Sequence, residues 1–324
     1  MTTKNGFNLN ITGIKSAENT ADYEVMRIES AELIGIVTVL FNSDDVLLGF
    51  FESLRRQRSV RYRLYIIDNS KTDTGSRLCR ELAELYAIEV VIVFNDANVG
   101  VARGNNQGIE RALSDGCTQV LLSNNDIEFI DPDLIVNMAK FAKDLNAEAV
   151  VPKIYYYSDR KRIWCAGGRF SQYAATTPHI GDGEIDCGQY DTARVIDYAP
   201  TCFMLLRADV FSQVGMMDER YFVYYDDVDF MWRMKSVGKQ LHYWPQGQVW
   251  HKVSFSTGGS ESLFSLYYGF RNRIIFIRKN YTIGMRALSI AYIYATLIVK
   301  CMRYEQEQRD AIFRGLNEGF AIQL

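Results

Sequence analysis

The feature that most limits the fold is a regular alternation of short apolar runs with longer amphipathic stretches, which begins at Leu33. The expected strands cover 33–41, 64–68, 90–94 and 119–122, and the expected helices cover 44–57, 79–85 and 105–113. Strands separated by helices form a mostly parallel sheet that carries helices on both faces. Ligands bind beyond the carboxyl ends of such strands, so the loops that begin at Asn42, Asp68, Asn95 and Asn124 should share one rim.

The second half of the chain changes character at about residue 154. Residues 154–197 are rich in tyrosine, glycine and polar side chains, and a strand at 199–206, a helix from Asp209 and a strand ending at 249–251 follow them. From Ser260 onward the pattern is mostly helical. We interpret this half as an extension of the same α/β core, followed by a helical C-terminal region.

Composition excludes several classes of protein. The formal charge of -3 over 324 residues argues against a nucleic-acid binder, because such proteins usually carry a basic face. The six cysteines form no CxxC pair and there are only three histidines, so a structural zinc site is not expected. The N-terminus is polar and lacks the apolar run of a signal peptide, which favours a reducing, cytoplasmic setting with free thiols.

One apolar segment covers 287–299, with Arg286 before it and Lys300 after it. It is shorter than the roughly 20 residues that a membrane span requires. Two interpretations stay open. The segment is either a buried core helix, or part of an interfacial helix within 283–303 that contacts a membrane surface with help from the basic residues around it.

Polar residues at the ends of the expected strands are the first candidates for a binding site. The carboxylate of Asp68 can accept a hydrogen bond from a pyrimidine base, or it can cap the following helix, and both interpretations remain open. Arg103 lies between Gly100 and Gly104, where glycine lets the backbone approach a ligand and a guanidinium matches a diphosphate. The loop after the first strand holds no GxGxxG motif, which disfavours a Rossmann dehydrogenase.

Asn124 and Asp126 follow the fourth expected strand with one residue between them. Oxygen ligands of this kind suit a hard divalent cation that also contacts a diphosphate. His251 is a candidate for a further ligand, although a lone histidine is more often a hydrogen-bonded structural residue. The pattern therefore indicates a Mg²⁺ or Mn²⁺ site at Asp126, with His251 as its candidate partner.

Three carboxylates, Asp226, Asp227 and Asp229, occur within four positions beside aromatic side chains. Like charges repel and burial raises a carboxyl pKa, so such a cluster is costly as packing alone. Helix capping would explain Asp226 or Asp227 without catalysis. A carboxylate with a raised pKa is also what a general base needs to remove a proton from a hydroxyl.

Six short motifs follow one another along the chain. They are VTVLFN at 37–42, IDNS at 67–70, NVGVARGNN at 98–106, LLSNND at 121–126, YYDDVD at 224–229 and VWH at 249–251. In this order and spacing the chain resembles the family 2 glycosyltransferases of GT-A fold, and among them the rhamnosyltransferase-like branch of bacterial polysaccharide synthesis. The resemblance runs from about residue 33 to residue 273, and Tyr267, Tyr268, Arg271 and Asn272 match a further segment that recurs in that branch.

The resemblance implies an inverting enzyme that moves a sugar from a nucleotide-diphosphate donor to an acceptor hydroxyl. It implies a polar extension at 1–32, a catalytic domain at 33–258 and a helical region at 259–324, with a nucleotide-binding half at 33–126 and an acceptor-binding half at 127–258. The implied roles are catalysis for Asp227 (the base) and Asp226; donor binding for Thr38, Phe41, Asn42, Asp68, Asn98, Arg103, Asn124 and Asn125; metal binding for Asp126 and His251; and acceptor binding for Thr201, Cys202, Tyr225 and Asp229.

Three departures from the family pattern qualify these roles. Asn124 replaces the first carboxylate of the DxD-type metal motif, as is usual in this branch, and Asp226 replaces a more common glutamate. The segment from Thr201 lacks the glycine that the family often has there. The donor implied is a dTDP or UDP sugar, rhamnose first, and the acceptor a glycan or lipid-linked glycan, at the inner face of the cell membrane.

Two other functions stay open. A sugar nucleotidyltransferase also uses a nucleotide, a metal and an α/β sheet, but the glycine-rich phosphate loop typical of such enzymes is absent after the first strand. A non-catalytic assembly subunit with the same fold is the second alternative. The carboxylates at 126, 226, 227 and 229 argue against a degenerate site.

Overall fold

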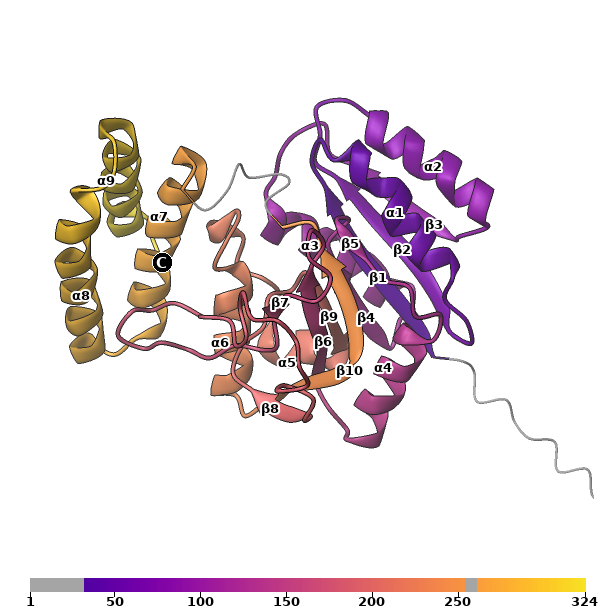
Figure 1. Ribbon diagram of the computed structural model, residues 1–324. Helices are drawn as coiled ribbons and strands as arrows, with labels where there is room; N and C mark the ends of the chain where they lie inside the picture. The colour runs from indigo at the N-terminus through magenta and orange to yellow at the C-terminus, as the bar shows by residue number, and fades with distance from the viewer. Residues whose placement is uncertain (1–31, 254–260) are drawn as a thin grey trace, which may run out of the picture. The chain divides into compact units, whose positions relative to one another are not determined.

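The computed structural model describes residues 32–253 and 261–324 (Figure 1). Apart from Glu32, the polar extension expected at 1–32 lies outside the described residues.

The first half of the chain forms the expected alternation. Its elements are β1 (Leu33–Leu40), α1 (Asp44–Arg55), β2 (Arg61–Asp68), α2 (Thr74–Tyr86), β3 (Val90–Phe94), α3 (Val101–Ser114) and β4 (Gln119–Ser123). The four strands pair in parallel, in the order β3-β2-β1-β4. Helices α2 and α3 begin earlier than expected, because their first turns are polar or glycine-containing and hide the apolar period.

The second half extends the same sheet. Its elements are β5 (Ile127–Glu128), α4 (Leu134–Asp144), β6 (Ala149–Tyr156), β7 (Ile163–Cys165), β8 (Arg194–Ile196), β9 (Phe203–Arg207), α5 (Asp209–Val214), the 3₁₀ turn η1 (Glu219–Tyr221), α6 (Asp226–Ser236) and β10 (Leu241–His251). The order continues from β4 through β9, β6 and β10 to β5. Strand β9 is antiparallel to both its neighbours, and β5 is antiparallel to β10. The strand expected at 199–206 starts only at Phe203, because Thr201 and Cys202 form a turn.

Two apolar layers enclose the sheet. One layer joins α1, α2 and α4 to one face, with Phe50, Leu82 and Met138 in the same cluster as Ile36. The other joins α3, α5 and α6 to the opposite face, where Val37 belongs to the cluster. Both faces of the parallel strands are therefore covered, which explains their continuous apolar sequence and confirms the α/β class (Figure 1).

Helices α7 (Leu263–Asn280), α8 (Ile283–Cys301) and α9 (Gln306–Ala321) form the expected C-terminal region. Helix α7 packs closely on α9, where a Cβ added to Gly315 would lie 2.4 Å from the carbonyl oxygen of Tyr267. Helix α8 buries only one edge, at Ser289, Ile293 and Leu297. It is therefore not the buried core helix that was one of the two expectations. No helix among the described residues is long and apolar enough to cross a membrane.

Candidate active site

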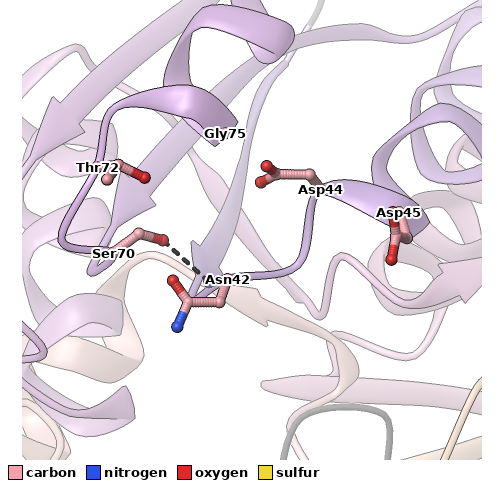
Figure 2. A pocket seen from close by; sticks show the side chains of 6 residues that line it. All are labelled: Asn42, Asp44, Asp45, Ser70, Thr72 and Gly75. Carbon is pink, nitrogen blue, oxygen red and sulfur yellow. Dashed lines mark hydrogen bonds between the residues drawn. The ribbon is translucent and has the colours of Figure 1, made fainter.

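The loops that follow β1 and β2 enclose a small polar pocket (Figure 2). Its volume is about 200 Å³, and its lining residues are Asn42, Asp44, Asp45, Ser70, Thr72 and Gly75. The backbone N–H of Asn42 donates to the Ser70 hydroxyl at 3.0 Å, which ties the two loops together. Carboxylate, amide and hydroxyl groups offer the donors and acceptors that a base or a ribose needs. The sequence motifs missed Asp44, Asp45 and Thr72, although their position just after two strand ends was a usable signal.

The carboxylate of Asp68 lies behind the wall of this pocket, next to the lining residue Gly75. Its side chain is fully buried, and it accepts hydrogen bonds from the N–H groups of Ser70 and Ser76 and from the Ser76 hydroxyl, at 2.6–3.1 Å. Ser76 lies in the first turn of α2, where backbone N–H groups lack helical partners. These bonds support the capping interpretation of Asp68, and recognition of a base stays a prediction.

Asp126 and His251 meet although they lie 125 positions apart along the chain. Strands β10 and β5 pair antiparallel with His251 opposite Ile127, and this register places His251 Nε2 3.2 Å from Asp126 Oδ1. Both side chains are buried, and neither Asp126 Oδ1 nor His251 Nδ1 has a hydrogen-bond partner among the described residues. A buried polar atom without a partner is costly, which points to a missing ligand at this pair.

These two side chains fit a divalent cation that takes its other ligands from a substrate and from water. Mg²⁺ is usually held by one or two carboxylates together with substrate phosphates, and carboxylate and water ligands suit Mn²⁺ as well. The described residues contain no cluster of three or more histidine, cysteine or acidic side chains placed to hold a metal. Within the part of the chain that the structure describes, Asp126 and His251 are therefore the candidate metal-binding pair.

Asp226 and Asp227 begin helix α6. Asp226 is 4% exposed, and burial raises its pKa, with the charge of Asp227 raising it further. Burial also raises the pKa of Asp227, but that carboxylate is only half-buried and accepts hydrogen bonds from the Tyr198 hydroxyl at 2.6 Å and from the Val228 N–H at 2.7 Å. These bonds favour the ionised form of Asp227. Asp227 is therefore the more exposed carboxylate of the pair, and its hydrogen bonds favour the form that can act as a base.

The backbone just before α6 is strained. Phe222, Tyr224 and Tyr225 have φ angles of 65°, 61° and 67°, a region that side-chain-bearing residues rarely adopt. Asn272 on α7 holds this segment, because its side-chain amide donates to the carbonyl oxygens of Tyr221, Val223 and Tyr224 at 2.7–2.9 Å. On the other side Gly100 is required, since a Cβ there would lie 2.6 Å from Phe222.

Three aromatic side chains connect the Asp126–His251 pair with the Asp226–Asp227 pair. The sequence motifs did not include them. The Trp164 ring lies 4.5 Å from the His251 ring and 4.7 Å from the His179 ring, and His179 stacks on Tyr198, the hydrogen-bond donor to Asp227. Burial lowers the pKa of His179, which favours its neutral form. The only signal for these residues was the aromatic-rich composition of 154–197, which contains Trp164 and His179 and directly precedes Tyr198.

Comparisons with known proteins identify this arrangement. The model of the family "Glycosyl transferase family 2" matches residues 35–214, which is more than half of the chain. The chain belongs to that family. Its members transfer sugars, and this protein is a glycosyltransferase.

Individual relatives agree with the family. The chain is 22% identical over 249 residues to the low-salt glycan biosynthesis hexosyltransferase Agl10 of Haloferax volcanii, covering 75% of this chain and 74% of that one. It is 22% identical over 252 residues to the dTDP-rhamnosyl transferase RfbF of Shigella flexneri, covering 75% and 80%. The mannosyltransferase PcManGT of Pyrobaculum calidifontis shares the fold, with a TM-score of 0.56, 11% identity and coverage of 89% and 86%. These matches confirm the GT-A fold and the rhamnosyltransferase-like resemblance.

The glycosyltransferase places most of its expected donor residues around the rim. Phe41 and Asn42 are exposed beside the pocket, and Asn42 has a positive φ of 48°. Asn124 is exposed, whereas Asn125 is buried and donates to the Ser43 hydroxyl. Thr38 is 1% exposed inside β1, so its side chain does not reach the rim.

Asn98 and Arg103 lie at the start of α3. The side chain of Asn98 accepts from the Gly100 N–H at 3.1 Å and so shapes the loop. The Arg103 side chain is 57% exposed, and its nearest carboxylate, that of Glu219, is 4.0 Å away. A guanidinium this weakly held is free to turn toward an anionic ligand.

The expected acceptor residues divide into two groups. Thr201 and Cys202 lie beside the site, because the Cys202 carbonyl accepts a hydrogen bond from the Asn124 N–H at 2.8 Å. Burial raises the pKa of the Cys202 thiol most strongly, and charge interactions with Cys165, Asp126 and Asp227 raise it further. The Tyr225 hydroxyl donates to the Ala175 carbonyl at 2.8 Å.

Asp229 has a different place from the one expected. It is fully buried, and its carboxylate accepts from Arg233, Lys279, Asn280 and Tyr221 at 2.7–3.2 Å. No acceptor position of this carboxylate is left for a substrate. Asp229 therefore anchors α6 to α7, and we do not include it in the acceptor site.

Proposed function

We propose that this glycosyltransferase transfers a sugar, with rhamnose as first candidate, from a nucleotide-diphosphate donor to a hydroxyl of a glycan or lipid-linked acceptor, with inversion of the anomeric carbon. The observation that carries the proposal is the placement of Asp227. It is a reachable carboxylate with a raised pKa, held by Tyr198 and linked through aromatic rings to the Asp126–His251 pair.

In this proposal Asp227 accepts the proton of the acceptor hydroxyl as that oxygen forms a bond to the anomeric carbon. A carboxylate with a raised pKa is a stronger base, and its ionised form is retained through the bonds from Tyr198 and Val228. The bond from the anomeric carbon to the diphosphate oxygen breaks in the same step, and the nucleoside diphosphate leaves. No nucleophile from the protein is needed, so a single displacement inverts the centre.

Asp126 and His251 would hold a Mg²⁺ or Mn²⁺ ion together with the diphosphate, and the ion would neutralise charge on the leaving group. The donor base would lie in the pocket between the β1 and β2 loops, and Arg103 is free to approach the diphosphate. The name of the relative RfbF, a dTDP-rhamnosyl transferase, supports dTDP-rhamnose as the first donor to test.

We also propose that α8 contacts a membrane surface on which a lipid-linked acceptor is presented. Its exposed side chains are almost all apolar, namely Ile283, Leu288, Tyr292, Tyr294, Ile298 and Val299, with Met302 just beyond its end. Arg286 and the exposed Arg303 border this surface and suit anionic lipid. Cosedimentation with anionic vesicles should fall when Leu288 and Ile298 are both changed to serine. Equal binding of the variant and the parent would contradict this contact.

Product analysis tests the reaction. The purified protein is incubated with dTDP-rhamnose or a UDP sugar, an acceptor glycan and Mn²⁺, and the released nucleotide and the new linkage are analysed by chromatography and NMR. Free nucleoside diphosphate and an inverted anomeric centre are expected. Pyrophosphate would instead identify a nucleotidyltransferase, and binding of donors without turnover of any acceptor would favour a non-catalytic subunit. A thermal-shift screen of donors with and without Mn²⁺ ranks ligands beforehand, because bound ligand raises the melting temperature.

A further inference from the structure

The side chain of Arg273 on α7 is buried, and no partner for it is found among the described residues. The residue is 9% exposed, and its Nε is a buried donor without a hydrogen-bond partner there. Other cations of the same helix are fully engaged: Arg271 bonds to Glu318, Arg278 to two backbone carbonyls, and Lys279 to Asp218 and Asp229. Arg273 differs from these neighbours because no acceptor for it lies within residues 32–253 or 261–324.

Burial of a guanidinium is unfavourable unless an anion or several acceptors replace the lost water. Unlike lysine, arginine cannot escape this cost by losing its proton. The fold therefore keeps Arg273 charged at an expense to its own stability. Such an arrangement is expected where the missing acceptor belongs to a ligand.

Arg273 lies near the segment that leads into the catalytic carboxylates and near the link between α7 and α8. Its neighbour Asn272 donates to the Tyr224 carbonyl, and Phe276, one turn farther along α7, packs against the rings of Tyr225 and Tyr281. Burial raises the pKa of Tyr225 and of Tyr281, and the positive charge of Arg273 partly offsets this rise in both. The guanidinium therefore lies near these two hydroxyls. Tyr225 directly precedes Asp226, and Tyr281 lies in the link between α7 and α8. Lipid-linked glycans carry their groups in the same order, with a sugar hydroxyl first, then a phosphate, then hydrocarbon.

Open space lies next to this position on α7. Helical side chains lean toward the N-terminus, so Arg273 is directed over the turn that contains Gly269. A Cβ added to Gly269 would have no heavy atom within 4 Å. The helix surface is thus open at Gly269, one turn before Arg273.

We propose that Arg273 binds a phosphate or diphosphate group beside the catalytic carboxylates, and that the acceptor supplies this group. The proposal rests on the proposed function and deepens it, because it assigns the acceptor a phosphate next to the sugar that is extended. The donor diphosphate is the other source of the same chemistry, but the Asp126–His251 pair already offers it a place.

The test is titration calorimetry with inorganic pyrophosphate on the intact protein, after the donor site has been saturated with dTDP or UDP and Mn²⁺. The variants are Arg273→Gln, Arg273→Lys and, as a matched control, Arg314→Gln, which removes an exposed cation of the same C-terminal helices. We expect the parent and Arg314→Gln to bind pyrophosphate, Arg273→Gln to bind at least tenfold more weakly, and Arg273→Lys to lie between them. We also expect ligand-free Arg273→Gln to melt no lower than the parent, because the lost charge has no partner.

Other results would overturn the proposal in distinguishable ways. If the parent and Arg273→Gln bind pyrophosphate equally, Arg273 is not part of a phosphate site. If Arg273→Gln no longer binds dTDP or UDP, and the nucleotide-saturated parent binds no pyrophosphate, then Arg273 contacts the donor diphosphate rather than an acceptor phosphate. A much lower melting temperature of both Arg273 variants gives the residue a structural role. Failure of the parent to bind any nucleoside diphosphate counts against the proposed function instead.

Discussion

Asp68, at the end of β2, and Asp227, in the first turn of α6, are both partly or fully buried aspartates that accept a hydrogen bond from the start of a helix, yet they are held in opposite ways. Asp68 accepts three hydrogen bonds from serines of its own loop and helix, and its side chain is closed to solvent. Asp227 follows a strained segment, remains half-buried, and has one side-chain donor, Tyr198, that arrives from a distant part of the chain. The first arrangement shapes a loop, whereas the second leaves a carboxylate available for chemistry.

The two sites also differ in what holds them. The Asp68 turn is stabilised locally, by residues within eight positions. The Asp226–Asp227 segment depends on α7, whose Asn272 lies 48–51 positions farther along the chain. Helix α7 in turn packs on α9. The C-terminal helices therefore help to position the catalytic carboxylates.

The largest effect is expected from Asp227→Asn. The amide keeps the size of the side chain and can still accept the bond from Tyr198, so the fold should be retained, but it cannot take a proton from the acceptor. Turnover should fall by about 10²- to 10⁴-fold, the usual contribution of a general base. Release of nucleoside diphosphate at saturating substrates measures it, and Asp209→Asn, at the start of α5, is the matched control. Near-parental turnover of Asp227→Asn would make the base assignment wrong.

The next effect is expected from Asn272→Ala, which removes the donor to three backbone carbonyls of the strained segment. Displacement of a reacting group by about 1 Å can cost roughly 100-fold in rate, so a fall of about 10- to 100-fold in kcat is expected, with the donor KM unchanged. Asn280→Ala, on the same helix, is the control, because its amide bonds to Asp229 rather than to the segment. A variant that melts earlier but keeps its kcat would show that Asn272 only stabilises the fold.

The difference between the two aspartates also explains what the sequence could predict. The alternation of strands and helices follows from local periodicity, and β3 was predicted to the residue. The capping of α2 by Asp68 was one of two local interpretations. The order of the motifs identified Asp126, His251 and Asp227 individually. Their neighbours Trp164, His179 and Tyr198 come from a region of the sequence without a periodic pattern. Only contacts between distant parts of the chain place these neighbours in the site.

Asp229 shows the opposite limit. Three nearby carboxylates looked alike in sequence, and the structure separates them by their distance from cations. Asp229 lies one helical turn before Arg233 and next to Lys279. Its carboxylate therefore forms buried ion pairs and does not contact the substrate. Arg273 likewise has no sequence signature that distinguishes it from the engaged Arg271. Partners that are distant along the chain decide both cases.

A smaller effect is expected from Asp68→Asn, and on stability rather than on turnover. The amide nitrogen would face the N–H donors of Ser70 or Ser76, leaving a buried donor unpaired, so the free energy of unfolding should fall by about 1–3 kcal/mol. Denaturant melts measure this, and Asp73→Asn is the control, because Asp73 precedes α2 without a capping bond. If instead the ligand-free stability is unchanged and donor affinity is lost, Asp68 recognises the base, and the contrast with Asp227 disappears.

The smallest effect is expected from Tyr198→Phe, which leaves Asp227 in place and removes its side-chain hydrogen bond. That bond lowers the pKa of Asp227 against the raising effect of burial, so its loss should raise the pKa. A base acts in its ionised form, and activity rises with pH through the pKa of the coupled Asp226–Asp227 pair. The acidic limb of the kcat/KM profile should therefore move to higher pH, by about one unit for a single hydrogen bond. Tyr155→Phe, which removes a buried hydroxyl bonded to Asp186 elsewhere in the fold, should leave the limb where it is. A limb that moves to lower pH, or equally in both variants, would mean that Tyr198 does not set the charge of Asp227.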